Sequence, residues 1–125
     1  MTNAVRRILI VDDENPIADM IGDFCASIGH ETRVLNDGET VMNVVREFKP
    51  DLILLDLIMP NVSGIEVMEN LSADPIAKSI PVIIISSIAN GVSAEGILKE
   101  CKAILAKPIK IRTLQDNIQQ ALSPK

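Results

Sequence analysis

The sequence contains no tryptophan and no tyrosine, and phenylalanine occurs only twice among its 125 residues. Aromatic residues make up 2% of the chain, which excludes a core built on aromatic rings. Hydrophobic residues still account for 47% and charged residues for 23%, a balance typical of globular proteins. We therefore expect one aliphatic core of Ile, Leu, Val, Ala and Met, in a single domain that spans residues 1–125 with its core at about 5–122.

Cysteine and histidine are also scarce, with two cysteines and one histidine. Cys25 and Cys101 stand far apart, lack a metal-type spacing and fall in segments that we expect to be helical. We therefore predict buried free thiols and no disulfide. His30 follows Gly29 and has no partner at ligand spacing, so we expect an exposed loop histidine.

Positive charge is in deficit, because 12 Lys and Arg residues face 17 Asp and Glu residues, for a net charge of -5. A phosphate backbone requires a basic face, so we expect no direct nucleic-acid binding by this domain. Magnesium or a basic partner suits this charge better. No apolar run approaches the length of a membrane span, and residues 1–7 lack the apolar core of a signal peptide. We therefore expect a cytoplasmic protein with no membrane partner.

Three short runs are apolar throughout, at residues 8–11, 52–55 and 82–85. They are too short for capped helices and too apolar for strands with one face in water, so we expect strands buried on both faces. Weaker runs at residues 31–35 and 103–106 predict two more strands. Strands of this kind are typical of a parallel sheet that helices cover on both faces.

Apolar residues recur with a helical period between these runs and predict five helices, at residues 14–28, 41–48, 65 to about 75, 86–98 and 111–122. The helix at 86–98 should be the weakest, because Gly91 and Gly96 each cost about 1 kcal/mol relative to Ala. Strict alternation of strands and helices predicts an α/β fold with a doubly wound, five-stranded parallel sheet. Such sheets bind ligands beyond the carboxyl ends of their strands.

Polar side chains stand where the expected strands end: Asp12, Asp13, Asp56, Ser86 and Lys107. Because the carboxyl ends of parallel strands meet at one edge of a sheet, we expect these groups to converge. Three carboxylates in one place require a counter-charge, since like charges disfavour ionisation. Oxygen ligands and the absence of a nearby His or Cys are typical of a Mg²⁺ site, for which Mn²⁺ could substitute.

Asp56 ends an apolar strand, where the metal and the Lys107 ammonium would offset its charge. A carboxylate beside Mg²⁺ can attack phosphorus and form an aspartyl phosphate. Ser86 would then donate its hydroxyl to one phosphoryl oxygen, and Lys107 would pair with another. Alternatively, Asp13 merely caps the first helix and Asp56 merely forms a turn before Pro60, although capping does not explain two adjacent acids.

Four segments occur in order and at workable spacing: ILIVDDE, LILLDLIMPNVSG, IPVIIISS and ILAKPI. With them the chain resembles, over nearly its whole length, a bacterial response-regulator receiver domain of the single-domain, chemotaxis-regulator type. The resemblance implies a flavodoxin-like sheet in the order 2-1-3-4-5, an order that is not inferred independently of the family. It also implies a two-component signalling phosphoprotein that assists its own phosphorylation and dephosphorylation but is not a turnover enzyme.

The resemblance implies a role for each residue that matches a family motif. The metal-binding positions match Asp12, Asp13, Asp56 and the backbone carbonyl of Ile58. Asp56 also matches the phosphoacceptor, and Ser86 and Lys107 match the pair that binds the phosphoryl group and switches the surface. The structural positions of the family match Met59, Pro60, Gly64 and Pro108, the last of which usually follows a cis peptide bond.

Three positions depart from the family pattern. Ile104 stands where the family usually has Tyr or Phe, so the aromatic switch is absent. Ser87 replaces a usual Ala, and Glu100 replaces the Gly expected before the last strand. These changes put the usual surface of helix four and strand five in doubt, whereas phosphoryl acceptance requires none of the three.

The resemblance implies phosphoryl transfer from a sensor histidine kinase or a phosphotransfer protein. A downstream protein would bind the face formed by helix four, strand five and helix five, and a homodimer through this region stays open. Two alternatives are a pseudo-receiver that binds partners without phosphorylation and a receiver fragment of a larger multidomain regulator. A phosphatase of the haloacid dehalogenase type is disfavoured, because it needs a second aspartate where this chain has Ile58.

Overall fold

The centre of the molecule is a sheet of five parallel strands. The structure, a computed structural model, describes residues 5–57, 64–86 and 101–122. The strands are β1 (Arg7–Val11), β2 (Glu31–Leu35), β3 (Leu52–Asp56), β4 (Val82–Ser86) and β5 (Ala103–Ala106). They lie in the order β2-β1-β3-β4-β5, and each neighbouring pair is parallel. The doubly wound sheet and the order expected from the resemblance are confirmed.

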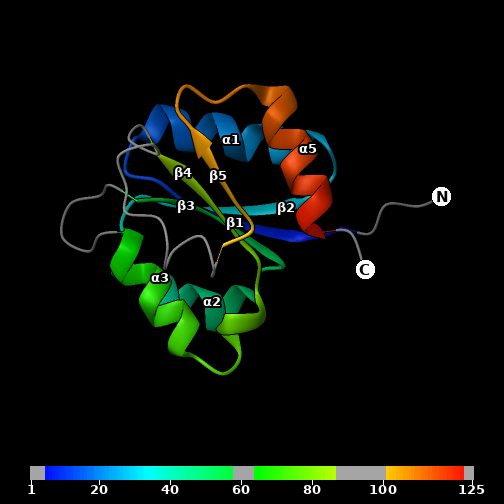
Figure 1. The fold of residues 1–125 in the computed structure, drawn as a ribbon. Helices are drawn as coiled ribbons and strands as arrows, with labels where there is room; N and C mark the ends of the chain where they lie inside the picture. The colour runs from blue at the N-terminus through cyan, green and yellow to red at the C-terminus, as the bar shows by residue number, and fades with distance from the viewer. Residues whose placement is uncertain (1–4, 58–63, 87–100, 123–125) are drawn as a thin grey trace.

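Helices cover both faces of the sheet (Figure 1). Two of them, α1 (Asn15–Ser27) and α5 (Ile111–Leu122), lie on one face, and α2 (Val41–Phe48) and α3 (Gly64–Ala73) lie on the other. A short 3-10 helix, η1 (Ala77–Ser79), precedes β4 and is absent from the sequence prediction. Apart from Ser86, which ends β4, the helix predicted at 86–98 lies outside the described residues. Within the described ranges, no helix has the length and apolar character needed to cross a membrane.

The core consists of two aliphatic layers, one on each side of the sheet. Successive side chains of a strand point to opposite faces. Leu9 and Val11 of β1 therefore pack with α2 and α3, whereas Ile8 and Ile10 pack with α1 and α5. A fully buried Ile or Leu side chain contributes roughly 1.5–3 kcal/mol, so these layers stabilise the central strands strongly. The ends of β1 and β3 are thereby held in a fixed position.

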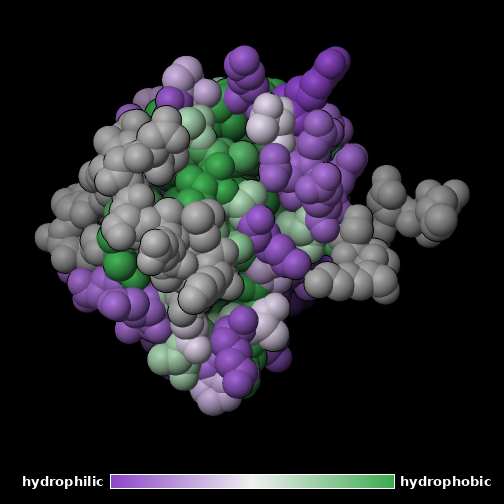
Figure 2. Space-filling model, viewed as in Figure 1, coloured by the Kyte–Doolittle hydropathy of each residue, from purple (hydrophilic) through white to green (hydrophobic). Residues whose placement is uncertain are grey.

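The surface of the described residues is largely polar. Figure 2 shows hydrophilic side chains over α5 and hydrophobic side chains toward the middle of the view, where the strands lie. The large apolar side chains that are exposed are Val5, Met20, Ile65, Ile76 and Ile111. They belong to different elements, and exposed apolar residues that are scattered singly are normal on protein surfaces.

Two predictions about the scarce residues are wrong. Cys101 is half-buried and precedes β5 instead of lying in a helix, whereas Cys25 is buried in α1 as expected. The two cysteines form no disulfide, as predicted. His30 is half-buried directly before β2, and its Nδ1 accepts a hydrogen bond from the backbone N–H of Arg6 at 3.3 Å. Burial and the nearby Arg6 charge lower the pKa of His30, despite the opposing effect of Asp51.

Candidate functional site

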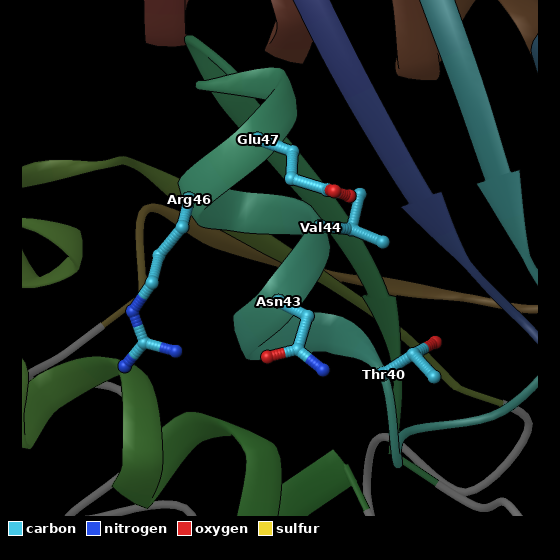
Figure 3. A pocket seen from close by; sticks show the side chains of 5 residues that line it. All are labelled: Thr40, Asn43, Val44, Arg46 and Glu47. Atoms are coloured by element: carbon cyan, nitrogen blue, oxygen red, sulfur yellow. The ribbon is translucent and has the colours of Figure 1, made fainter.

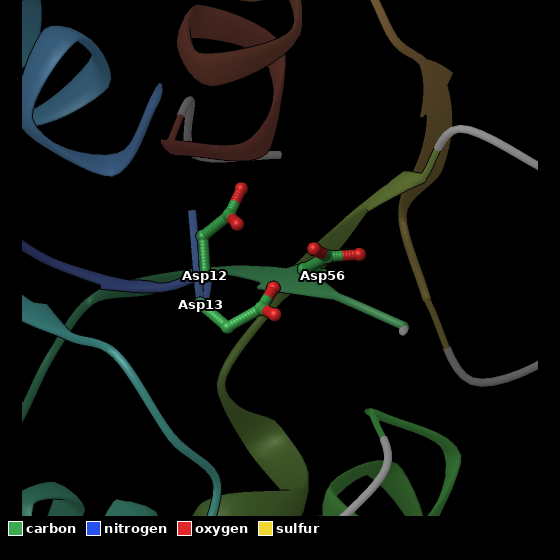
Figure 4. Close-up of side chains that lie close together, drawn as sticks. All are labelled: Asp12, Asp13 and Asp56. Atoms are coloured by element: carbon green, nitrogen blue, oxygen red, sulfur yellow. The ribbon is translucent and has the colours of Figure 1, made fainter. Parts of the chain in front are cut away.

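Two neighbouring strands end at carboxylates. Asp12 directly follows β1, and Asp56 is the last residue of β3. Because the register pairs Val11 with Leu55, the two strand ends lie side by side. One oxygen from each of Asp12, Asp13 and Asp56 lies within 4.8 Å of the others, and Figure 4 shows the three side chains gathered at this edge of the sheet. The convergence of carboxylates expected from the sequence is therefore observed.

The ammonium group of Lys107 lies among these carboxylates. Lys107 directly follows β5, and its Nζ donates a hydrogen bond to Asp56 Oδ2 at 3.1 Å. The same nitrogen lies 3.1 Å from Asp12 Oδ2 and donates to Glu14 Oε1 at 2.6 Å. Burial acts to lower the pKa of Lys107, but its close contacts with the carboxylates of Glu14, Asp12 and Asp56 outweigh burial and raise this pKa. Lys107 is therefore charged over the whole physiological pH range.

Asp12 has one buried oxygen to which no hydrogen bond is donated. The residue is only 2% exposed, and its Oδ1 accepts the backbone N–H of Glu14 at 2.9 Å. Its Oδ2 has no hydrogen-bond partner in the described part of the chain, although the Lys107 ammonium lies 3.1 Å away as an ion-pair partner. A buried acceptor left unsatisfied costs about 1–3 kcal/mol, and more when it is charged. A bound cation at this oxygen would remove that cost.

The set of donors fits a hard divalent cation. All three candidate ligands are carboxylates, two of them buried and one half-buried. Mg²⁺ is usually held by a few carboxylates and keeps several waters, whereas zinc prefers His and Cys ligands. The candidate ligand group found among the described residues includes no His and no Cys. The chemistry of the donors therefore matches Mg²⁺ better than zinc.

Ser86 lies at the same edge of the sheet as the acidic cluster. It ends β4 and pairs with Ala106 of β5, one position beyond the pair formed by Ile85 and Asp56. Five other residues that the sequence singles out lie outside the described residues: Ile58, Met59, Pro60, Ser87 and Glu100. The metal contact expected from Ile58 and the surface changes expected from Ser87 and Glu100 stay predictions.

Three further residues support the strand ends. Gly64 begins α3, and its N–H donates to the carbonyl of Leu57 at 2.9 Å. A Cβ atom at Gly64 would overlap the backbone of Asp56 and Leu57, so a side chain cannot fit there without a shift. The peptide bond before Pro108 is cis, as the resemblance implies. Ile104 is half-buried against the core layer on the side of α2 and α3.

Glu14 is a member of the site that sequence reasoning missed. It occupies the N-cap position of α1, yet its side chain makes no capping hydrogen bond and contacts Lys107 instead. The alternative in which Asp13 is the cap of this helix is therefore wrong. The sequence offers a weak signal, since Glu14 directly follows the acidic pair, but no local pattern links it to a lysine 93 residues away.

A surface hollow among the described residues lies away from this cluster. It has a volume of about 610 Å³ and is lined by Thr40, Asn43, Val44, Arg46 and Glu47 (Figure 3). These residues belong to α2 and the residue before it, and none of the clustered carboxylates contributes to the lining. This open, polar hollow brings together no chemically reactive group, so we assign the function to the acidic cluster.

Comparison with known proteins identifies the class. Residues 8–119 match the family model described as the response regulator receiver domain. The polar-differentiation response regulator DivK of Brucella anthropi is 32% identical over 118 residues, which cover 94% of this chain and 96% of DivK. The DNA-binding response regulator MtrA of Mycobacterium leprae is also 32% identical over 118 residues, which cover 94% of this chain and 51% of MtrA. The chain belongs to the response regulator receiver domain family.

Solved structures agree with this assignment. A CheY-like response regulator receiver domain from Methylobacillus flagellatus has a TM-score of 0.84 at 23% identity and covers 94% of this chain and 99% of its own. A second structure is the receiver domain of a sensor histidine kinase from Pseudomonas aeruginosa, which is described with a magnesium ion coordinated in its active site cleft. It has a TM-score of 0.85 at 25% identity and covers 95% of this chain and 98% of its own. Receiver domains are the phosphoacceptors of two-component systems and not classical enzymes. The chain spans about half the length of the MtrA relatives it matches.

Proposed function

We propose that this chain accepts a phosphoryl group on Asp56, with the help of Mg²⁺, and thereby changes its affinity for a protein partner. The observation that carries this proposal is the meeting of Asp12, Asp13 and Asp56 within 4.8 Å, together with the Lys107 ammonium 3.1 Å from Asp56 Oδ2. Carboxylates and one lysine at the ends of parallel strands form a site for an anionic group only if a cation offsets their charge. A receiver site meets this requirement.

Asp56 would act as the nucleophile. One of its carboxylate oxygens attacks the phosphorus of the donor and forms a new P–O bond, while the bond between phosphorus and the donor atom breaks. The electron pair of that bond leaves with the donor, which is acetate when the donor is acetyl phosphate. Lys107, already within reach of Asp56, would pair with a phosphoryl oxygen as negative charge moves onto it, and the Ser86 hydroxyl would donate to another. Later attack by water on phosphorus would restore the carboxylate.

The carboxylates of Asp12, Asp13 and Asp56 and the backbone carbonyl of Ile58 would hold the metal, and Mn²⁺ could substitute for Mg²⁺. When bound, the metal supplies positive charge that offsets the carboxylates and the transferred group. The unsatisfied Asp12 Oδ2 supports this assignment, because a buried carboxylate oxygen is expected to have a partner. The Pseudomonas aeruginosa relative, whose magnesium ion lies in the active site cleft, supports it independently.

The proposed partners are a sensor histidine kinase or phosphotransfer protein, which supplies the phosphoryl group, and a downstream protein that binds near β5 and α5. The absence of a disulfide between the two cysteines is typical of a reducing compartment, so we propose a cytoplasmic location. The net charge of -5 disfavours direct contact with DNA, although the MtrA relatives are named as DNA-binding. Self-association stays open.

The test is incubation with acetyl phosphate, with and without Mg²⁺, followed by intact mass spectrometry. We expect one added phosphoryl group that requires Mg²⁺ and is lost in Asp56→Asn. The matched control is Asp23→Asn, an exposed aspartate on α1 that lies outside the cluster, and it should accept the group normally. Absence of any adduct with every donor would favour the pseudo-receiver. Turnover of unrelated phosphomonoesters would favour the phosphatase.

A further inference from the structure

The shortest contact of Lys107 is with a residue that the proposed phosphoryl transfer does not use. Its Nζ lies 2.6 Å from Glu14 Oε1, compared with 3.1 Å from Asp12 Oδ2 and 3.1 Å from Asp56 Oδ2. Metal binding and nucleophilic attack account for Asp12 and Asp56. Neither accounts for Glu14.

The partners of the ammonium decide what happens when a phosphoryl group arrives. Two of the three N–H bonds of the Lys107 ammonium already donate to Glu14 and Asp56, and Asp12 Oδ2 lies 3.1 Å from the same nitrogen. A phosphoryl oxygen on Asp56 would enter this group of anions and compete with the carboxylates for the ammonium. Phosphoryl acceptance is therefore favoured when one of these carboxylates gives up Lys107.

Glu14 is the partner that can leave at the lowest cost. Its side chain is 54% exposed, whereas the side chains of Asp12 and Asp56 are 3% and 4% exposed and extend from the ends of buried strands. A released Glu14 carboxylate would be solvated by water, but a released Asp12 or Asp56 carboxylate would stay in a poorly solvated site. The ion pair with Glu14 is the exchangeable one.

The backbone of Glu14 is held without its side chain. Its N–H donates to Asp12 Oδ1 at 2.9 Å, and its carbonyl accepts the N–H of Ala18 at 2.9 Å. Its side chain does not cap α1. A change from glutamate to glutamine should therefore alter the ion pair and leave the start of the helix in place.

We propose that Glu14 is a releasable anchor for Lys107, a positioning role that rests on the phosphoryl acceptance proposed above. In the unphosphorylated protein, Glu14 holds the ammonium at the edge of the acidic cluster, and it gives up the ammonium when Asp56 carries a phosphoryl group. The ion pair with Glu14 thus opposes phosphoryl acceptance. Its strength sets how readily Asp56 is phosphorylated.

The first experiment measures the rate at which acetyl phosphate and Mg²⁺ add a phosphoryl group in the wild type, in Glu14→Gln and in a matched control, Glu31→Gln. Glu31 is also half-exposed and ion-paired, with Arg7 Nε at 3.4 Å, but it lies at the start of β2, away from the cluster. Both variants change the net charge equally. We expect a rate about 3-fold higher in Glu14→Gln, as for a half-exposed ion pair, and no change in Glu31→Gln. Equal rates in all three proteins would overturn the role of Glu14.

The second experiment needs no phosphoryl donor. A double-mutant cycle of Glu14→Gln and Lys107→Met, measured by urea unfolding without Mg²⁺, isolates the energy of this ion pair. We expect a coupling that changes the unfolding equilibrium constant by about 3-fold. Zero coupling would overturn the anchor even if the wild type accepts phosphoryl groups normally. If no protein in the first experiment forms an adduct, the proposed function fails and the release step fails with it, whereas the cycle still reports whether Glu14 holds the lysine.

Discussion

Replacement of Lys107 by methionine tests the charge balance of the site most severely. Methionine keeps most of the volume of the lysine side chain and removes its ammonium. That ammonium contacts Asp12, Asp56 and Glu14, and the Lys107 side chain that carries it is only 9% exposed. Without it, the buried carboxylates of Asp12 and Asp56 lose the ion pairs that Lys107 makes with both of them. We therefore expect Lys107→Met to be destabilised in the absence of divalent cations.

The expected magnitude follows from the contact distances. At an effective dielectric constant of about 20, opposite charges 3.1 Å apart attract by roughly 5 kcal/mol before the cost of desolvation is subtracted. Removal of one partner from a buried ion pair typically costs about 3–5 kcal/mol. Because Glu14 and Asp13 connect the cluster to solvent, we expect the lower end, about 3 kcal/mol. With a urea slope of about 2 kcal/mol/M, the unfolding midpoint would fall by about 1.5 M.

The assay is urea unfolding at neutral pH, first with a chelator and then with Mg²⁺ in excess. Mg²⁺ should narrow the difference in unfolding free energy between wild type and Lys107→Met, because the metal replaces the lost positive charge. Lys110→Met is the matched control, since Lys110 is exposed and close in sequence, and it should change stability by less than about 0.5 kcal/mol. Equal stability of Lys107→Met and wild type in chelator, or a difference that widens with Mg²⁺, would refute this reasoning.

Three further predictions concern other parts of the structure. Gly64→Ala should lower the free energy of unfolding, measured in urea, by about 1–3 kcal/mol and should slow phosphoryl acceptance, because the added Cβ would press on the backbone of Asp56. If the unfolding free energy and the rate of phosphoryl acceptance both stay unchanged, the close contact is contradicted. Burial and the Arg6 charge lower the pKa of His30 in the folded state, so the unfolded chain binds the proton more tightly. Stability should therefore be complete above the unfolded pKa of about 6.5 and fall as the pH drops below it, with a weaker fall in His30→Gln. Burial raises the pKa of the Cys25 thiol to about 12, so little reactive thiolate forms at neutral pH. A thiol reagent should therefore modify Cys101 and leave Cys25 unreacted until the protein unfolds, whereas rapid reaction of Cys25 in the folded protein would contradict this prediction.

The strands β1, β3 and β4 were the most predictable, because they are apolar on both faces and polar residues stand at their ends. Residues 52–55 contain only Leu and Ile, and the strand observed there differs from the prediction only in including Asp56. The amphipathic helix at the C-terminal end was predicted to the residue, since its apolar spacing matches one buried face. The strand order needed the family resemblance, because periodicity alone does not say which strands are neighbours.

The acidic cluster was predictable for a related reason. Parallel strands bring their carboxyl ends to one edge, so the sequence places Asp12 and Asp56 at the same edge of the sheet, and the family strand order makes their strands neighbours. The contact between Glu14 and Lys107 could not be predicted, because it joins a helix start to the end of a distant strand through two flexible side chains. No periodic signal records a contact of this kind.

Local side-chain hydrogen bonds account for the other differences. The helix η1 follows Asp74, whose Oδ1 accepts the backbone N–H groups of Ile76 and Ala77. Such a turn depends on one aspartate and leaves no apolar pattern in the sequence. His30 was misplaced because its partner is the backbone N–H of Arg6, directly before the neighbouring strand β1, and this contact is visible only once the register of β1 and β2 is known.

The central claim is that Asp56 is the nucleophile of a cation-dependent acidic site, and chemical trapping tests it most directly. Borohydride reduces an aspartyl phosphate to homoserine, so the protein is treated with acetyl phosphate, reduced, digested and analysed by peptide mass spectrometry. We predict homoserine at residue 56 when Mg²⁺ is present and none when it is chelated. Homoserine at another aspartate, or its complete absence despite added Mg²⁺, would contradict the account.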